Sequence, residues 1–459
     1  MPLNNRFDNF VKQAPVCVMA RGILERMFEP AVLNQVFDDS AELGYTRAIA
    51  FSTCIQLMSE VVLNTAPSLN AAYNALQAEL PEDEKFSATA LYNKLNGIEP
   101  CVSEALVDYS AAQAAEAVKA LGAKLPPWLP GYNARVLDGN HLASTEHRIE
   151  ELRAVWDAPL PGRALVVLDP QRMVVLKAVL TENGHASERS LIDPVLESIK
   201  RRDLWIEDRN FCFHRMIWGI VRRSAYFVVR QHGQMAGELK GKPTSQTRCD
   251  TGWVSEQRLV ITDPETQEKL TVRRITIQLD EPTRDGDEVM HILTNLPPKD
   301  ASTVKVAELY RNRWTIEKAF NEITMTLDCE VKTMGYPRAA LFAFCIALMV
   351  YNAVAVLKAA LRAVHGEVIV RDKISPYYMA LELSSTYQGM MIAIPEPHWA
   401  IFRRFSVREY AATLKQVASQ INLARYPKKP RGPKKKPPQK IRTTNGGNVS
   451  TFKIINQIK

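Results

Sequence analysis

Apolar residues recur every three or four positions through the first 125 residues, with little of the alternation that marks strands. Residues 31–37, 48–63 and 103–125 each carry such an apolar stripe, so we expect helices there. The periodicity therefore predicts a helical N-terminal domain over residues 1–125.

Two shorter helices are predicted between those segments, within residues 67–100. Ser68 and Ser87 are suited to cap them, because a serine hydroxyl accepts a hydrogen bond from a free N–H at a helix start. Two short helices around a turn can form a DNA-reading unit. In that case the polar residues of the second helix would contact bases. A plain helical bundle that does not bind DNA explains the pattern at least as well. The polar residues concerned are Asn93, Lys94 and Asn96.

The pattern changes after the sequence PPWLPG at residues 126–131, which ends the helical run. Short apolar runs then alternate with amphipathic segments, as is typical of a mixed α/β domain. Two of these runs flank the turn sequence DPQR and predict a hairpin. The expected strands are 134–142, 163–168, 173–180, 203–211 and 225–231, and the expected helices are 187–202 and 213–223.

Short alternating strands with polar loops follow, and they predict a β-rich insertion. An apolar strand over 289–297 and a helix over 303–320 come next. The apolar stretch 339–357 is nearly long enough to cross a bilayer, but Asn352 lies inside it, and we interpret it as a buried core helix. The expected domains are 1–125 helical and suited to DNA binding, 126–231 and 288–364 as the two parts of an α/β core, 232–287 as the insertion, 365–424 as a C-terminal helical region, and 425–459 as a basic tail.

The basic charge of the chain is concentrated near its C-terminus. The formal net charge is +8, and residues 425–442 hold nine Lys or Arg and no acidic residue, so the remainder has a net charge of −1. Such a tail, with Lys434, Lys435 and Lys436 at its centre, can bind DNA phosphates without sequence preference. A disordered, solubilising end has the same composition.

The seven cysteines are scattered and include no CxxC pair, which is typical of reduced thiols and not of a disulfide framework or a zinc site. The N-terminal sequence has no apolar signal-peptide core. We therefore expect a cytoplasmic protein that does not bind a membrane. The sequence also has no HExxH pair, no P-loop and no GxGxxG motif.

Three acidic residues stand out by their positions. Asp138 and Asp208 each follow an apolar run, and in open α/β sheets ligands bind at the ends of strands. Glu317 lies on a polar stripe of the helix predicted over 303–320, with Arg313 and Tyr310 one and two turns before it. Three carboxylates can bind one or two Mg²⁺ ions, because hard cations prefer carboxylate oxygen. The arginine and the tyrosine would then face a DNA phosphate.

Each acid taken alone also has an ordinary explanation. Asp138 precedes Gly139 and suits a turn, Asp208 can form a surface ion pair with Arg209, and Glu317 can lie on a solvated helix. His141, close after Asp138, fits a structural role or the site. Trp253, in the insertion, is suited to stack on an unpaired base or to pack in the core.

Together these elements resemble the DDE transposases of bacterial insertion sequences, in the insertion-sequence-four branch. That branch has a signature of Tyr, two residues, Arg, three residues, Glu, six residues and Lys. It also has an Asp-Gly element, an Asp-Arg strand end and a β-rich insertion before the glutamate. The matching residues here are Tyr310, Arg313, Glu317, Asp138-Gly139, Asp208-Arg209 and the segment 232–287, and the resemblance covers about residues 130–445.

The resemblance implies an RNase H-like α/β fold, in which a mixed sheet with flanking helices is interrupted by the insertion and preceded by the helical domain. It implies metal-dependent phosphodiester hydrolysis at the ends of a mobile element and strand transfer into target DNA. Asp138, Asp208 and Glu317 would bind two Mg²⁺ ions, for which Mn²⁺ can substitute. The implied partners are double-stranded DNA and a second copy of the chain in a synaptic complex, and the implied location is the nucleoid of a bacterial cytoplasm.

The chain departs from the signature at one position, where Thr324 replaces the family lysine. A catalytically weakened or inactive DNA-binding relic therefore stays open as an alternative. A structure-selective nuclease with the same RNase H-like core is a second alternative, which would cut DNA without joining it.

Overall fold

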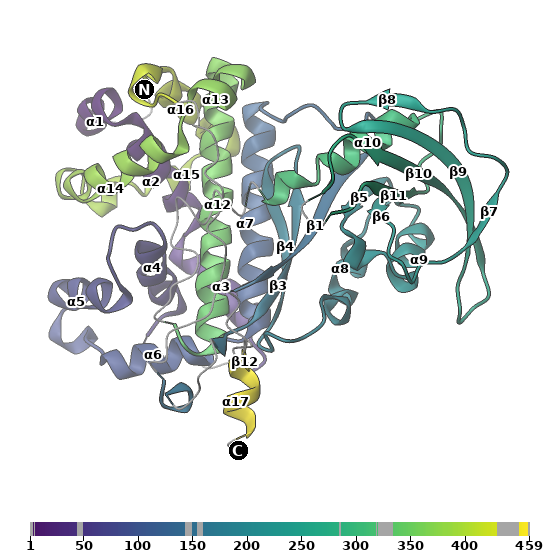
Figure 1. The fold of residues 1–459 in the computed structure, drawn as a ribbon. Coiled ribbons are helices and arrows are strands. Elements are labelled where there is room, and N and C mark those ends of the chain that lie inside the picture. The colour runs from purple at the N-terminus through teal and green to yellow at the C-terminus, as the bar shows by residue number, and fades with distance from the viewer. Residues whose placement is uncertain are drawn as a thin grey trace.

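A computed structural model of the protein describes residues 3, 5–43, 49–142, 149–153, 159–283, 286–317, 319, 334–428 and 449–457. Two long helices, α7 (Pro100–Leu121) and α12 (Pro337–His365), pack against each other through the middle of the molecule. They separate a helical half, on the left of Figure 1, from a curved sheet on the right.

The helical half combines the two ends of the chain, because the C-terminal helices pack on α2. Ser68 and Ser87 accept hydrogen bonds from the N–H groups of Ala71 and Ala90, which confirms both predicted caps. The helices are α1 (Asp8–Gln13), α2 (Pro15–Met27), α3 (Pro30–Ser40), α4 (Phe51–Val62), α5 (Leu69–Glu79), α6 (Ala88–Gly97), α13 (Glu367–Lys373), α14 (Pro376–Ala393), α15 (Ile401–Arg404) and α16 (Val407–Ser419).

Ten strands form one mixed sheet in the described part of the chain, in the order β4-β3-β1-β5-β6-β11-β10-β9-β7, with β8 paired to β9. In its first half, β1 pairs antiparallel with β3 and parallel with β5, and β5 pairs parallel with β6, as in an RNase H-like core. The strands are β1 (Asn133–His141), β3 (Arg163–Asp169), β4 (Val174–Thr181), β5 (Asp203–Glu207), β6 (Tyr226–Arg230), β7 (Glu238–Lys240), β8 (Thr247–Cys249), β9 (Gly252–Thr262), β10 (Lys269–Leu279) and β11 (Val289–Thr294).

The predicted hairpin is confirmed, because β3 and β4 pair antiparallel around the DPQR turn. The strands of the β-rich segment belong to the same sheet as the core, since β10 pairs with β11 and β11 pairs with β6. Figure 1 shows these strands curving away from α12 at the far edge of the molecule.

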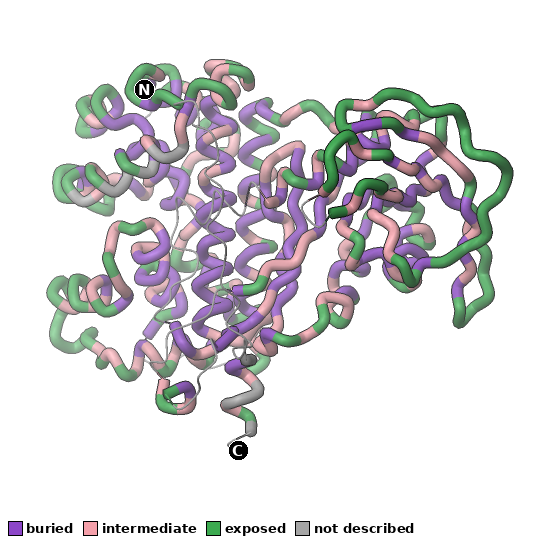
Figure 2. Tube along the Cα trace, viewed as in Figure 1, coloured by how far each residue is buried: buried purple, intermediate pink, exposed green. Residues whose placement is uncertain are grey.

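Helices cover both faces of the core strands. Helices α8 (Asp193–Ser198) and α9 (His214–Arg222) lie on one face, where Trp205 is buried. Helix α10 (Thr303–Arg311) lies on the opposite face, and its Leu309 packs in the same cluster as Ile206. Figure 2 shows the resulting continuous buried layer through the sheet and along α7 and α12. The face under α10 is the one that carries the candidate site.

Helix α12 is the apolar stretch seen in the sequence. By length and composition it could cross a membrane, but 94% of its most apolar window is buried inside the fold. The N-terminal helices pack on one side of it, and α7 and β4 pack on the other. This burial is that of a core helix, as expected from the position of Asn352.

Strand β4 lies at the edge of the sheet, and the Asn352 side chain makes hydrogen bonds to its main chain that a neighbouring strand would otherwise make. Its Oδ1 accepts a hydrogen bond from the N–H of Val175 at 2.8 Å, and its Nδ2 donates to the carbonyl of the same residue at 3.0 Å. Nδ2 also donates to Ser110 Oγ at 3.0 Å, and the side chain is fully buried. An edge strand covered by helices needs such partners, because unpaired main-chain groups are costly to bury.

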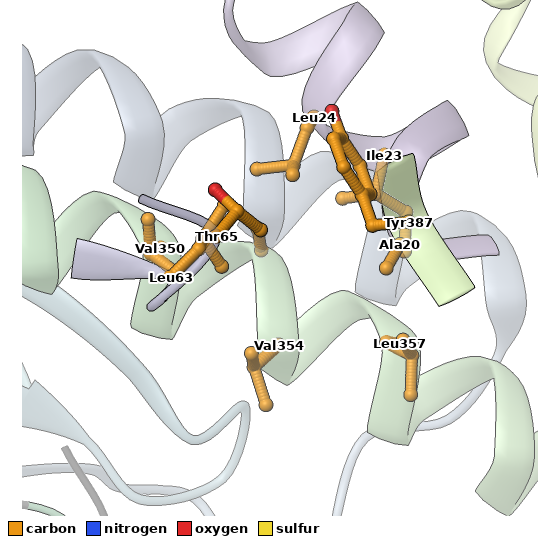
Figure 3. Close-up of a pocket in the computed structure, with 10 residues that line it drawn as sticks. Ala20, Ile23, Leu24, Leu63, Thr65, Val350, Val354, Leu357 and Tyr387 are labelled. Carbon is orange, nitrogen blue, oxygen red and sulfur yellow. The ribbon is translucent and has the colours of Figure 1, made fainter. Parts of the chain in front are cut away.

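A small apolar cavity of about 30 Å³ lies beside α12, between α2 and α14 (Figure 3). Val354 and Leu357 line it from α12, and Tyr387 lines it from α14. Its walls are almost wholly hydrocarbon, so it is a packing gap and not a site for polar chemistry.

Two expectations are wrong in detail, one about the end of a strand and one about the C-terminal segment. The strand predicted over 203–211 ends at Glu207, and a 3₁₀ turn, η5 (Arg209–Phe211), follows it. The segment 425–459 is not wholly a tail, because β12 (Val449–Ser450) pairs with β2 (Pro159–Leu160) and continues into α17 (Thr451–Gln457). Ser450 and Thr451 are buried there, and Ser450 Oγ donates to Asn183 Oδ1 at 3.0 Å, so this segment docks on the core.

Candidate active site

Asp138 and Asp208 lie next to each other because of the register of two parallel strands. Leu137 of β1 pairs with Glu207 of β5, so the next residue on each strand is one of the two acids. Neighbouring strands are about 4.8 Å apart, and paired residues of parallel strands point to the same face. The sequence suggested that Asp138 ends its strand, but β1 continues past it to His141 along β3.

The third acid comes from the segment after α10. The helix predicted over 303–320 is interrupted, since α10 ends at Arg311 and Asn312 is its C-cap. The N–H groups of Arg313 and Ile316 donate to the carbonyls of Tyr310 and Arg313, which is the tighter spacing of a 3₁₀ turn. This tightening places the Arg313 side chain inward, with only 7% of the residue exposed.

Arg313 links two of the acids directly. Its Nη1 lies 3.3 Å from Asp138 Oδ2, and its Nη2 donates to Glu317 Oε1 at 3.0 Å. Asp208 is contacted by Tyr310 instead, whose hydroxyl donates to Asp208 Oδ1 at 3.3 Å. The structure thus brings together all three acids and both of their predicted companions, from β1, the turn after β5, and the end of α10.

The charges at this site are unbalanced. Burial raises the pKa of Asp138 to about 6; Arg313 opposes this rise, and the charge of Glu317 adds to it. Although burial lowers the pKa of Arg313, its neighbours Tyr310 and Asp138 raise it above the usual value. The three carboxylates and the Arg313 guanidinium together carry a net charge of −2 when all four groups are ionised, although Arg313 contacts only Asp138 and Glu317 directly.

The donor chemistry of the site fits a divalent cation. Carboxylate oxygens are the ligands that Mg²⁺ and Mn²⁺ prefer, and the excess negative charge would be neutralised by one such ion. Within the described part of the chain, however, no three His, Cys, Asp or Glu side chains are close enough to hold one ion as they stand. The Arg313 guanidinium lies between Asp138 and Glu317, so binding requires these side chains to rearrange.

A polar cavity of about 350 Å³ adjoins the site on the side of the second acid. Arg209, the residue after Asp208, lines it together with Arg230 and His232. Arg230 forms an ion pair with Asp287 at 2.6 Å, whereas the Arg209 guanidinium has no hydrogen bond or ion pair to a residue in the described part of the chain. The cavity offers cationic donors next to the carboxylates.

The other predicted DNA contacts are placed differently. Trp253 is 45% exposed on β9, with the guanidinium of Arg248 over its ring, so it does not pack in the core. Lys94, the charged residue of α6, donates to the carbonyl of Ile49 at 2.6 Å. Its ammonium group is therefore used in a contact within the fold. Thr324 and the three lysines Lys434, Lys435 and Lys436 lie outside the described residues.

Two residues near the site were not singled out from the sequence. Trp314 is 54% exposed beside the carboxylates, and Arg313 stacks on its ring at 5.4 Å. Glu188 contacts the turn after Asp208, and it approaches Gly139 as well. An aromatic residue next to the signature arginine was a visible signal for Trp314, whereas Glu188 stands in a polar loop with no pattern around it.

The chain is similar to a known domain family and to a solved structure. Residues 131–353 match the family model described as the transposase DDE domain. The cryo-EM structure of a piggyBac transposase synaptic complex with hairpin DNA is similar to this chain with a TM-score of 0.40 and 10% identity, covering 91% of this chain and 86% of that one. No curated protein matches the chain. The segment that the family model matches, residues 131–353, contains the three acids and the strands that carry them, so this part of the chain is similar to a transposase DDE domain.

Proposed function

We propose that this protein is a DDE-type DNA transposase that cuts DNA at the ends of its own mobile element and joins those ends to target DNA, with Asp138, Asp208 and Glu317 as the ligands of Mg²⁺. The observation that carries the proposal is that Arg313 contacts the carboxylates of Asp138 and Glu317 while Tyr310, one turn before it, contacts the carboxylate of Asp208. Two ions are expected, with Mn²⁺ able to substitute, because both the attacking and the leaving oxygen of a phosphodiester then have a cation.

The reaction has two steps at phosphorus. In the first, a water oxygen bonds to phosphorus and the bond from phosphorus to the 3′ oxygen breaks, which frees a 3′-hydroxyl. In the second, that hydroxyl attacks a phosphorus of the target strand, and the bond to the target 3′ oxygen breaks. Divalent cations held by the carboxylates would acidify the attacking water and neutralise the charge that develops on the phosphoryl oxygens.

The residues around the acids have separate roles in this proposal. Arg313 would turn its guanidinium from Asp138 and Glu317 to the phosphate, which it can contact with two parallel N–H groups. The Tyr310 hydroxyl orients the Asp208 carboxylate by donating to it. The Asp138 side chain is largely shielded from water, being 20% exposed, and this strengthens its charge interactions.

Double-stranded DNA, as terminal repeats and as target, is the proposed partner. Arg209 and Arg230 line the polar cavity, and their guanidinium groups would contact the phosphates of a DNA strand bound beside Asp208. Trp253, exposed on β9, would stack on an unpaired base, and Lys434, Lys435 and Lys436 would bind DNA phosphates.

We place the enzyme in the insertion-sequence-four branch and in the nucleoid of a bacterial cytoplasm, on the spacing of Tyr310, Arg313 and Glu317 and on the β-rich segment before them. Two ends must be cut and joined together, so two chains would act in one synaptic assembly. Thr324, where the branch has lysine, supports one alternative, a relic that binds element ends without cutting them. A nuclease that cuts irrespective of terminal repeats and joins nothing is the other.

The test incubates the full chain with Mg²⁺ and DNA carrying the inverted repeats that flank its gene, and it follows both nicking and strand transfer. Asp138→Asn, Asp208→Asn and Glu317→Gln should each lower the nicking rate at least about a hundredfold, because each removes a charge that stabilises the transition state. Asp250→Asn is the matched control, since Asp250 is an exposed partner of Arg311 away from the acids. Undiminished nicking in any of the three variants removes that residue from the site, and nicking without joining favours the nuclease.

A further inference from the structure

Two short turns are joined by side chains directly beside the first two acids. One is η5, which begins immediately after Asp208 and has that residue as its N-cap. The other is η4 (Glu188–Leu191), a 3₁₀ turn that follows β4. The proposed chemistry gives η4 no role, although two of its side chains contact the Asp208 turn.

Consecutive residues of η4 hold Asn210 from two sides. The Asn210 Nδ2 donates to Glu188 Oε2 at 2.5 Å, and the Arg189 Nε donates to the Asn210 carbonyl at 2.9 Å. The Arg189 guanidinium also stacks over the ring of Phe213 at 5.3 Å, which fixes its position. The turn that starts at Asp208 is therefore restrained in both its side chain and its main chain, two residues after the acid.

Glu188 also meets the strand of the other acid. A Cβ atom added at Gly139 would lie 2.2 Å from Glu188 Oε1, so the carboxylate rests directly against the main chain there. The N–H of Gly139 donates to Asp138 Oδ1 at 3.0 Å, which couples that stretch of main chain to the acid. Glu188 is thus in contact with the residue after Asp138 and with the turn after Asp208.

The contact is on the back of the strand. Successive Cβ directions in a strand point to opposite faces, so the direction at Gly139 points away from the side chain of Asp138. Glu188 is 14% exposed on that rear side, where Arg163 lies 4.0 Å from its Oε1. Glu188 therefore lies on the opposite face of β1 from the Asp138 carboxylate and cannot bind the same ion. Its contacts with Gly139 and Asn210 can only affect the positions of the acids.

We propose that Glu188 and Arg189 are positioning residues that set the separation of the Asp138 and Asp208 carboxylates for metal binding. This inference rests on the proposed function, because it takes both acids as metal ligands. Supporting residues of this kind fix the orientation of ligands, and their loss commonly weakens metal binding 10–100-fold. The same contact explains the glycine after Asp138 by space, since a side chain would displace the Glu188 carboxylate.

The test measures Mn²⁺ binding to the full chain by electron paramagnetic resonance of the free ion, with nicking of end DNA as a second readout. Glu188→Ala should raise the dissociation constant for Mn²⁺ about tenfold or more. Glu188→Gln keeps an acceptor for Asn210 and should stay within about threefold of the wild type. Glu197→Ala, an exposed glutamate on α8, is the matched control and should leave binding unchanged.

Gly139→Ala makes the argument specific to the contact. Alone it should weaken Mn²⁺ binding as much as Glu188→Ala, and combined with Glu188→Ala it should add nothing, because the collision is gone. Melting temperatures of all variants, measured without metal, separate this effect from unfolding.

Three outcomes overturn the proposal: wild-type Mn²⁺ affinity in Glu188→Ala, a loss in Glu188→Gln as large as in the alanine variant, or additive losses in the double variant. Failure of the proposed function is a different result. It would appear as tight Mn²⁺ binding that survives Asp138→Asn and Asp208→Asn, whatever the η4 variants do.

Discussion

Replacing Asn352 by leucine should destabilise the fold severely, although leucine suits an apolar helix better than asparagine does. The side chain accepts from the N–H of Val175 and donates to its carbonyl, at 2.8 and 3.0 Å, and it is fully buried. Leucine leaves both main-chain groups without partners. Each such group costs about 1–3 kcal/mol, so we expect a loss of about 2–6 kcal/mol. That is a large part of the about 5–15 kcal/mol that stabilises a typical domain.

The free energy of unfolding can be measured by urea denaturation followed by circular dichroism, and hydrogen exchange of residues 174–181 gives a local readout. Asn352→Leu should lower the urea midpoint and speed exchange in β4. Val354→Leu is the control, because Val354 lies on the same helix and lines the apolar cavity, where an extra carbon has room. The control should change stability by less than about 1.5 kcal/mol. An unchanged midpoint together with unchanged exchange in Asn352→Leu would refute the view that this side chain replaces a strand at the sheet edge.

Four further outcomes are expected. Burial raises the pKa of Glu104 to about 6, so the stability of the wild type should fall as the pH rises from about 4.5 to about 6. In Glu104→Gln the glutamine still accepts from the N–H of Leu180, so this variant should not show that fall and should be about 2 kcal/mol more stable than the wild type above pH 7. Parallel pH profiles of the two proteins in urea denaturation would contradict this. Arg313→Gln leaves Asp138 and Glu317 without their shared cation, so its melting temperature should drop without divalent ions and rise with Mg²⁺ more than that of the wild type; an equal response to Mg²⁺ counts against the arrangement. Changing Lys434, Lys435 and Lys436 to Gln should reduce the slope of log affinity for DNA against log salt by about two to three, and an unaltered slope excludes them as phosphate contacts. Trp253→Ala should weaken binding of end DNA with an unpaired base about tenfold but spare fully paired DNA, whereas equal losses on both would point to a structural role.

Much of the fold was predictable because it depends on residues close together in the chain. Ser68 and Ser87 cap helices through N–H groups three residues away, and the hairpin of β3 and β4 closes over the short DPQR turn. The apolar run around Asn352 predicted a buried helix by its composition alone. The spacing of Tyr310, Arg313 and Glu317 likewise indicated the family of the domain before any geometry was known.

The tertiary structure decided what those residues do to one another. The register of β1 on β5 places Asp138 beside Asp208, a relation between residues 70 positions apart that no local pattern encodes. The 3₁₀ turn after α10 sends Arg313 inward to Asp138 and Glu317, where a regular helix was predicted. Glu188 gained its importance only through its contacts with Asn210 and Gly139. Periodicity reports which face of an element is buried, but which side chains meet depends on packing between elements, because those contacts join positions that are distant in the chain.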